Sequence, residues 1–388
     1  MIRLAISLLI FLQTVSPVIQ PDSSPSNVPV VRTAILCQPG IYMTDPQDCL
    51  PAGASSYLTK IATVGMTIPL LSIPYRPVDG SFWELPFSYA MLGDEPTPVY
   101  ASLEEAITGK NAIHSIEPGG LRYVSYIDYS DTDNGRFFKL HDETWVRVSS
   151  RVSIPHSYPG GIELDRTPSH SFGWVLPFNP TLETKRAPGY NPDGYTGHTL
   201  NQYQIVPIYD TQVVDNIEWD LVAPDEWVES RMLGRVTPNT TPPEGVTSDR
   251  WIEVNLDEQT LTVYDQNKLI YAALIASGMD PFFTKPGLFQ IQRKLDATPM
   301  SGSFAADRSD YYYLEDVPWT MYYDNARALH AAYWRTAFGF PQSHGCVNLG
   351  PADAHWLYDW ANEGDWVYVW DPSGKTPTDP KFYGEGGA

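Results

Sequence analysis

The feature that most constrains the fold is a series of short, alternating apolar runs in the C-terminal third of the chain. Trp251–Asn255 and Thr260–Tyr264 alternate as strands do, and Asp265–Asn267 supplies turn residues before a third run at Lys268–Ala276. Further runs of this kind are Phe289–Gln292, Trp319–Tyr323, Ala328–Trp334 and Trp366–Trp370. With 35 prolines and 28 glycines breaking up the 388 residues, short strands are favoured over long helices. We therefore expect a mainly β protein.

One short helix is expected within this region. Pro351 suits the first helical position, and Ala354, Leu357, Tyr358 and Ala361 recur at the spacing of one helix face. Gly364 is expected to cap the C-terminus of the helix. Residues 249–371 are therefore predicted to form a β-sandwich or barrel with one short helix, and the Gly-, Pro- and Thr-rich residues 372–388 a loose tail.

Two upstream segments, 91–160 and 161–236, share a pattern. Each has a strand ending in tyrosine, a strand with an aromatic residue, an acidic turn before Trp-Val, and a closing Arg-Val strand, which is Arg151–Pro155 in the first and Arg235–Pro238 in the second. Such short strands indicate small antiparallel β modules, which resemble bacterial SH3-like modules. They would either bind a cell-wall ligand or only space the C-terminal domain. Residues 237–248, rich in proline and threonine, are predicted to be a linker.

The N-terminus has the features of a secretory signal peptide. Met1–Arg3 carries a positive charge and precedes the apolar run Leu4–Leu12, so we expect residues 1–20 to be the signal and the protein to be secreted. The run is too short for a confident membrane span, although an uncleaved anchor stays open. No later stretch is predicted to cross a membrane. The net charge of −21 argues against nucleic acid or anionic lipid as partners.

The three cysteines divide into a pair and a single residue. Cys37 and Cys49 lie in residues 21–90, read as linker and N-terminal segment, and are expected to form a local disulfide in an oxidising compartment. Cys346 is then left as an inert buried thiol, a partner for another chain, or a reactive nucleophile.

The surroundings of Cys346 favour a nucleophile. It lies in Ser343–Asn348, two residues after His344, with Gly345 between them, and His330 lies sixteen residues upstream. A neighbouring histidine can take the proton of a thiol or lower its pKa. Alternatively, either histidine could be purely structural, or His330, His344 and Cys346 could be three zinc ligands. The wide spacing makes zinc the weaker interpretation, and no metal is expected.

His330, the run Ser343–Asn348, then Asp353 and Leu357–Tyr358 resemble the active-site signature of the L,D-transpeptidases (YkuD-type catalytic domains). The resemblance covers about residues 249–371. It implies that Cys346 attacks the carbonyl of the third stem-peptide residue of peptidoglycan and releases D-alanine, and that carbapenems acylate the same cysteine. No cofactor is implied.

The resemblance also implies roles for individual residues. His330 would be the general base and His344 would orient the site. The backbone N–H of Cys346, with Gly345 and the Tyr312 hydroxyl, would stabilise the oxyanion. The neighbouring Tyr311 and Tyr313 are alternatives to Tyr312. The substrate-binding residues implied are Tyr322, Trp334, Ser343 and Asn348. Cys346 and His330 would be two members of a catalytic triad. Because alanine follows His330, the third member would be a backbone carbonyl instead of a side chain.

Two other functions stay open on the sequence. An L,D-carboxypeptidase or other thiol hydrolase would use the same residues with water in place of an acceptor amine. A non-catalytic cell-wall-binding protein would rely on the β modules instead of Cys346.

Overall fold

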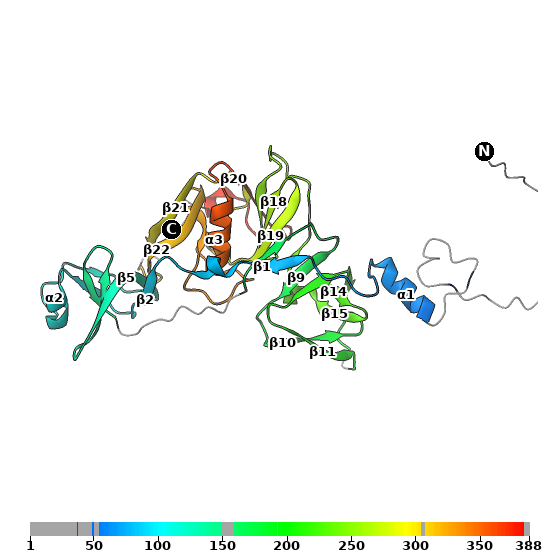
Figure 1. Cartoon of the computed structure of the whole chain (residues 1–388), viewed down its shortest axis with the longest axis horizontal. Helices are drawn as coiled ribbons and strands as arrows, with labels where there is room; N and C mark the ends of the chain where they lie inside the picture. Colours follow the sequence, from blue (N-terminus) through cyan, green and yellow to red (C-terminus); the bar gives the residue numbers. More distant parts are fainter. Residues whose placement is uncertain are drawn as a thin grey trace, which may run out of the picture. The chain divides into compact units, whose positions relative to one another are not determined.

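The structure is a computed structural model that describes residues 37, 49, 54–148, 159–191, 193–303 and 307–383 (Figure 1). Residues 1–60 and 61–388 form two compact units, which are described separately. The expected signal segment and the predicted strand Arg151–Pro155 lie outside the described residues. Within the described residues, no helix is long and apolar enough to cross a membrane.

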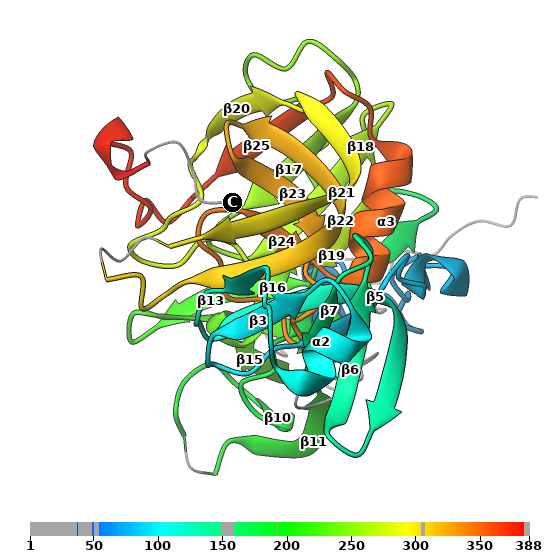
Figure 2. The ribbon, with the colours of Figure 1, turned by 90° about the vertical axis from the view of Figure 1, so that its left-hand side faces the viewer.

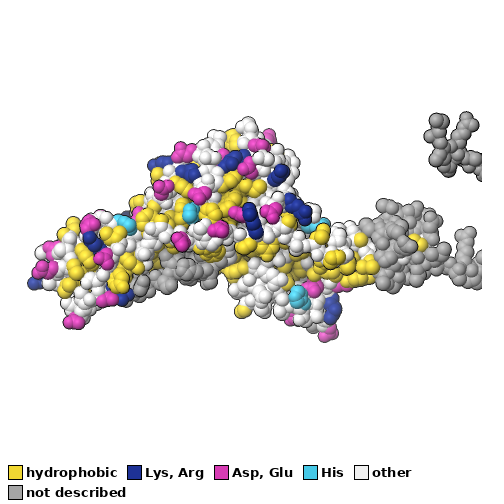
Figure 3. Space-filling model, in the orientation of Figure 1, with side chains coloured by type: hydrophobic (Ala, Val, Ile, Leu, Met, Phe, Trp, Pro, Cys, Tyr) yellow, Lys and Arg dark blue, Asp and Glu magenta, His cyan; other side chains and the backbone are white. Residues whose placement is uncertain are grey.

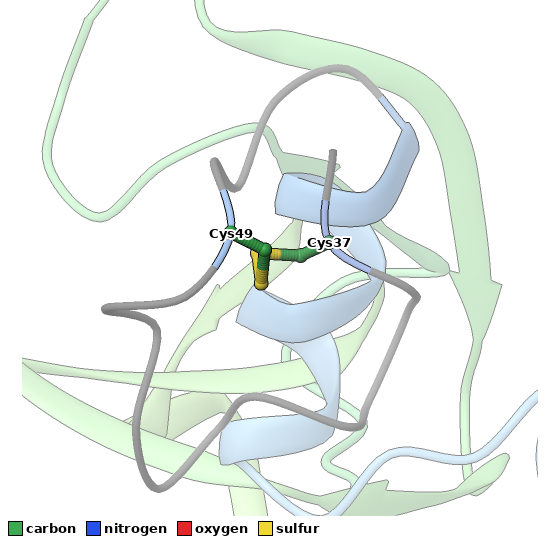
Figure 4. Close-up of a disulfide and its surroundings, with 2 residues drawn as sticks. All are labelled: Cys37 and Cys49. Atoms are coloured by element: carbon green, nitrogen blue, oxygen red, sulfur yellow. A yellow bond between two sulfur atoms is a disulfide. The ribbon is translucent and has the colours of Figure 1, made fainter. Parts of the chain in front are cut away.

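In the first unit, Cys37 and Cys49 are joined by a disulfide, with their Cα atoms 4.8 Å apart (Figure 4). Helix α1 (Ala54–Thr63) follows, with Lys60 in its last turn, where a positive charge is favourable to the helix dipole. The third cysteine of the chain, Cys346, is a buried free thiol.

A seven-stranded sheet contains the hairpins predicted from residue 251 onward. In spatial order its strands are β1 (Tyr75–Pro77), β8 (Ile162–Leu164), β19 (Lys268–Leu274), β18 (Thr260–Asp265), β17 (Trp251–Asn255), β25 (Trp366–Trp370) and β20 (Gly287–Gln290). Gln266 and Asn267 form the turn between β18 and β19, with φ of 51° and 57°. Two such residues suit the tight turn that matches the twist of paired strands. The predicted hairpin is therefore confirmed.

A ten-stranded sheet joins the C-terminal region to strands from far upstream. Its main path is β24 (Val347–Leu349), β23 (Arg327–Ala331), β22 (Tyr312–Asp324), β5 (Leu121–Thr132), β6 (Gly135–Leu140), β7 (Trp145–Arg147), β3 (Thr97–Tyr100) and β4 (His114–Ile116). β2 (Ser88–Met91) pairs with β5, and β21 (Arg293–Gly302) pairs with β22. The short helices α2 (Leu103–Thr108) and η2 (Gly80–Trp83) lie in the same upstream part of the chain. Strands predicted as a separate module are thus continuous with β22.

Helix α3 (Pro351–Trp360) packs against β22 and β23 (Figure 2). Val254 of the first sheet, Leu329 of the second and Leu357 of the helix are all fully buried in one core. Since burial of apolar surface is the main driving force of folding, this core holds the two sheets and α3 together.

The end of α3 differs from the prediction. Gly364 does not cap the helix: the cap is Ala361, in extended conformation, and Gly364 lies in the turn before β25 with φ +92°. Instead, Nζ of Lys294 donates to the carbonyl oxygens of Tyr358 (2.5 Å) and Ala361 (2.6 Å). The lysine satisfies carbonyls that a left-handed glycine would otherwise help to pair.

Residues 171–236 form two small antiparallel sheets. One has the order β11 (Tyr195–Asn201), β10 (Thr181–Lys185), β15 (Glu226–Glu229), β14 (Ile217–Ala223) and β13 (Asp210–Val214); the other has β12 (Ile205–Ile208), β9 (Ser171–Val175) and β16 (Leu233–Val236), preceded by η3 (Ser230–Met232). The strand β8, which opens the predicted second module, pairs with β19 instead of these strands. The SH3-like character of both modules stays a prediction.

The predicted tail is mostly exposed over residues 372–382, but it is anchored at Tyr383. A short helix, η4 (Pro380–Phe382), leads to Tyr383, whose side chain is buried. The carbonyl of Tyr383 accepts a hydrogen bond from the buried guanidinium of Arg327. This bond ties the end of the described chain to strand β23.

On the face of the molecule shown in Figure 3, Lys and Arg side chains lie among Asp and Glu side chains.

Candidate active site

The residues predicted for the site converge on one cavity of about 40 Å³. Seven of them line it: Tyr312, His330, Trp334, Ser343, His344, Cys346 and Asn348. Four more side chains, which the sequence did not single out, complete the walls: Leu121, Met300, Leu314 and Arg335. Gly345 and Tyr322 do not line the cavity. A space of this size admits about three waters or one small side chain.

The loop that carries Cys346 is held by its own side chains. Oγ of Ser343 donates to the carbonyl of Cys346 (2.6 Å) and accepts from the N–H of Gly345 (3.1 Å). Gly345 has φ +118°, a conformation that other residues rarely adopt, and its carbonyl accepts from Thr284 (2.9 Å). The N–H of Gly345 is therefore already used within the loop. Gly345 and Ser343 thus shape the loop. Because the Gly345 N–H donates to Ser343, it is not available for the oxyanion role that was expected of it.

The thiol of Cys346 is a neutral group at rest. The residue is 4% exposed, and its Sγ lies 3.7 Å from the carbonyl oxygen of Ala326. Burial raises the pKa of the thiol to about 11, although the backbone of Ala328 and the charge of Arg327 act in the opposite direction. The cysteine therefore needs a base when it attacks.

His330 lies on β23 and supplies a nitrogen suited to this task. Its Nδ1 lies 3.0 Å from the carbonyl oxygen of Ala331, so Nδ1 carries the proton and Nε2 keeps its lone pair. This carbonyl is the backbone partner that the sequence predicted in place of a side chain. Burial lowers the pKa of His330 to about 4, so the ring is neutral at pH 7.

Asn348 joins His330 to Arg335. In the amide orientation that satisfies both ends, Nδ2 of Asn348 donates to Nε2 of His330 (3.0 Å), and its Oδ1 accepts from Nε (2.6 Å) and Nη2 (3.2 Å) of Arg335. Asn348 is 2% exposed, which suits a residue that orients the histidine better than one that only binds substrate. Arg335 is itself held by Gln342 through bonds of 3.0 Å and 2.6 Å.

Two aromatic rings cover the other side of the thiol. The ring of His344 is stacked on that of Tyr312, with centroids 5.7 Å apart and an interplanar angle of 8°. Burial lowers the pKa of His344. The Tyr312 hydroxyl is buried without a hydrogen-bond partner among the described residues, and burial and then Cys346 raise its pKa above the usual range. It is therefore a neutral O–H donor on a residue that lines the cavity, which suits the predicted oxyanion role.

The remaining predicted residues take different positions. Trp334 lies beside His330, with ring centroids 5.9 Å apart. Tyr322 is half-buried on β22, with the guanidinium of Arg293 4.9 Å above its ring. Burial, then Cys346, raises the pKa of Tyr322, which does not line the cavity.

Sequence reasoning missed the two arginines that flank strand β23. Arg327 is buried, pairs with Asp324 (2.9 Å), and favours the thiolate of Cys346. Arg335 holds Asn348. Both lie within five residues of His330 in a chain with only 25 basic residues. The sequence shows that both arginines are near His330, and this could have marked them as candidate site residues. It does not show in which direction their side chains point.

The zinc interpretation lacks the arrangement it needs. Among the described residues, no group of three or more His, Cys, Asp or Glu side chains could hold a metal ion. A neutral thiol, a lone-pair imidazole and a neutral hydroxyl are instead a set suited to acyl transfer.

Comparisons with known proteins find similarity to L,D-transpeptidases over part of the chain. Residues 249–369 match the YkuD family, the L,D-transpeptidase catalytic domain. YciB of Bacillus subtilis, provisionally named as an L,D-transpeptidase, is 28% identical over 127 residues, which cover 28% of this chain and 59% of YciB.

Solved structures of L,D-transpeptidases also match. One from Stackebrandtia nassauensis is 27% identical, with a TM-score of 0.26 over 33% of this chain and 57% of that one. The catalytic domain from E. faecium is 26% identical, with a TM-score of 0.29 over 32% of this chain and all of that domain. The chain thus spans less than two thirds of YciB and of the Stackebrandtia protein. The segment 249–369 thus matches the family of L,D-transpeptidase catalytic domains, within a mostly β chain.

Proposed function

We propose that this protein is an exported cysteine transpeptidase that acts on peptidoglycan stem peptides. The observation that carries the proposal is that the free Cys346 lines the same cavity as His330, whose Nδ1 contact to Ala331 leaves the lone pair on Nε2. The family match of residues 249–369 supports the substrate class. The Cys37–Cys49 disulfide supports export, because disulfides persist in oxidising compartments.

The first half-reaction forms a thioester. Nε2 of His330 gives up its hydrogen bond from Asn348 and takes the thiol proton as Sγ of Cys346 attacks the carbonyl carbon of the third stem residue. The carbonyl oxygen becomes an oxyanion, which the Tyr312 hydroxyl stabilises. The carbon–nitrogen bond to the terminal D-alanine then breaks, and His330 returns the proton to the leaving amine.

The second half-reaction reverses these roles. The amine of an acceptor stem peptide attacks the thioester carbonyl and gives its proton to His330. The carbon–sulfur bond breaks, and the proton returns to Sγ of Cys346. The products are a new amide, which cross-links two stem peptides, and the free enzyme. No electrons are exchanged with a cofactor at any step.

The first test is acylation by imipenem, the carbapenem bound in a solved L,D-transpeptidase structure. Intact-protein mass spectrometry should show one added carbapenem on the wild type and none on Cys346→Ala. His330→Ala should be acylated more slowly, by about 10²–10⁴-fold, if the base acts as proposed. His114→Ala, an exposed histidine on β4, is the matched control and should behave as the wild type. An unmodified wild-type protein would overturn the proposal.

The second test separates an amine acceptor from water. Purified protein is incubated with a stem tetrapeptide, and the products are resolved by mass. A cross-linked dimer with released D-alanine is expected. A free tripeptide with no dimer would replace the transferase with a carboxypeptidase that uses the same residues.

A further inference from the structure

One wall of the cavity comes from a strand far outside the matched catalytic segment. β5 runs parallel to the start of β22, with Leu121 opposite Tyr312 and Tyr123 opposite Leu314. Residues in register on neighbouring strands place their side chains on the same face of the sheet. Leu121 and Tyr312 accordingly line the same cavity as Cys346.

Hydrogen bonds fix this junction between β5 and β22. The N–H of Ser125 donates to Oε2 of Glu315 (3.0 Å), and Oγ of Ser125 donates to the carboxylate of Asp316. The hydroxyl of Tyr89 on β2 donates to the carbonyl of Asp316 (2.6 Å). The contact between Ser125 and Asp316 is partly buried, and β5 cannot slide along β22 without losing these bonds.

Close backbone contact and aromatic packing fix it further. A Cβ at Gly119 would lie 2.1 Å from the carbonyl oxygen of Tyr311, so only glycine permits this approach. Tyr333, which precedes the cavity residue Trp334, is stacked on Tyr89 with ring centroids 3.6 Å apart. The edge of Tyr123 meets the same ring at 5.7 Å. The position of Leu121 on β5 is thus fixed by contacts with β22 and with the ring of Tyr333.

We propose that Leu121 is a specificity-determining residue, which restricts the leaving residue of the donor peptide to one with a small, uncharged side chain. This inference rests on the proposed transpeptidase function. A methyl group fits into the cavity of about 40 Å³, whereas a longer side chain has to contact its walls or extend through its open side. Leu121, Met300 and Leu314 make this wall apolar, which disfavours a charged group because its desolvation would be uncompensated.

The test compares two synthetic stem tetrapeptides that differ only in their terminal residue, D-alanine or D-leucine. The measured quantity is the ratio of kcat/KM for the D-leucine donor to that for the D-alanine donor. Leu121→Ala should raise this ratio at least about tenfold, because a few methyl or methylene groups in an apolar pocket discriminate by that much. Leu121→Val, a milder change that better preserves the fold, should raise it by a smaller factor.

Val124→Ala is the matched control. Val124 lies on the same strand, is fully buried in the core of the upstream module, and does not line the cavity. It should lower stability and leave the ratio unchanged. If neither Leu121 variant changes the kcat/KM ratio more than Val124→Ala does, the inference is overturned and the proposed function stays intact. A wild-type protein without Cys346-dependent turnover of either donor overturns both.

Discussion

Asp353 should make the stability of the catalytic domain fall as the pH rises. It lies in the first turn of α3, is 1% exposed, and its Oδ1 accepts from the N–H of Gly161 (2.6 Å) and the hydroxyl of Tyr271 (2.7 Å). Its Oδ2 has no partner among the described residues. Burial raises the pKa of Asp353 from 3.8 to about 7, although the two hydrogen bonds oppose this shift.

The shift has a definite sign and size. Because the pKa of Asp353 is higher in the folded state, the folded protein holds this proton more tightly than the unfolded chain does. The resulting stabilisation is complete below pH 3.8 and is lost as the pH rises through about 7. About three pKa units at about 1.4 kcal/mol each amount to roughly 4 kcal/mol, of which about 3 kcal/mol is lost between pH 4.5 and pH 8.

Asp353→Asn tests this value directly. The amide oxygen can still accept from Gly161 and Tyr271, but the side chain no longer ionises. The unfolding free energies of variant and wild type are measured with urea at pH 4.5 and at pH 8. The value for the variant minus that for the wild type should be about 3 kcal/mol higher at pH 8 than at pH 4.5. Asp359→Asn, at an exposed position of the same helix, should show no such shift. A shift below about 1 kcal/mol for Asp353→Asn would refute the burial argument.

Three further predictions follow from the buried charges and their partners. In a pH–rate profile, kcat/KM should decrease on the acid side with a midpoint near pH 4 instead of 6.5, because burial lowers the pKa of His330 to about 4. Asn348→Asp should move that midpoint to higher pH, because a carboxylate beside Nε2 favours the imidazolium; an unmoved midpoint would contradict the assigned contact. Arg235→Met should lower the unfolding free energy by about 3–5 kcal/mol, measured by urea unfolding, because it leaves Asp220 and Glu258 buried without their cation; a loss below about 1 kcal/mol would contradict this.

The local parts of the fold could be predicted from the sequence. The hairpin from Thr260 to Leu274 follows from alternation and two turn residues, all within a short stretch. The convergence of His330 and Cys346 could be anticipated because the connection through Gly339 and Pro341 can bring the chain back beside His330. In the structure, the strands of the two residues pair in parallel, with His330 opposite Asn348. The spacing in the signature is compatible with such a pairing.

The non-local parts could not be predicted in the same way. The pairing of Leu121 with Tyr312 joins strands almost two hundred residues apart, and no pattern in either strand specifies its neighbour. Gly364 was assigned as a helix cap from its position alone, but Lys294, from a distant strand, satisfies the carbonyls. In both cases tertiary contacts decided what local propensity left open.

The resting state of Cys346 links the site to the compartment proposed for the protein. A thiolate in an oxidising compartment exchanges readily with disulfides and is oxidised, and both reactions depend on thiolate character and exposure. Burial raises the pKa of Cys346 to about 11, so this residue stays a protonated thiol while Cys37 and Cys49 are oxidised. The neutral His330 does not ionise it at rest, since its Nε2 accepts from Asn348. The nucleophile is therefore generated only as a substrate carbonyl enters the cavity, which confines its reactivity to molecules that the walls around Tyr312 and Leu121 admit.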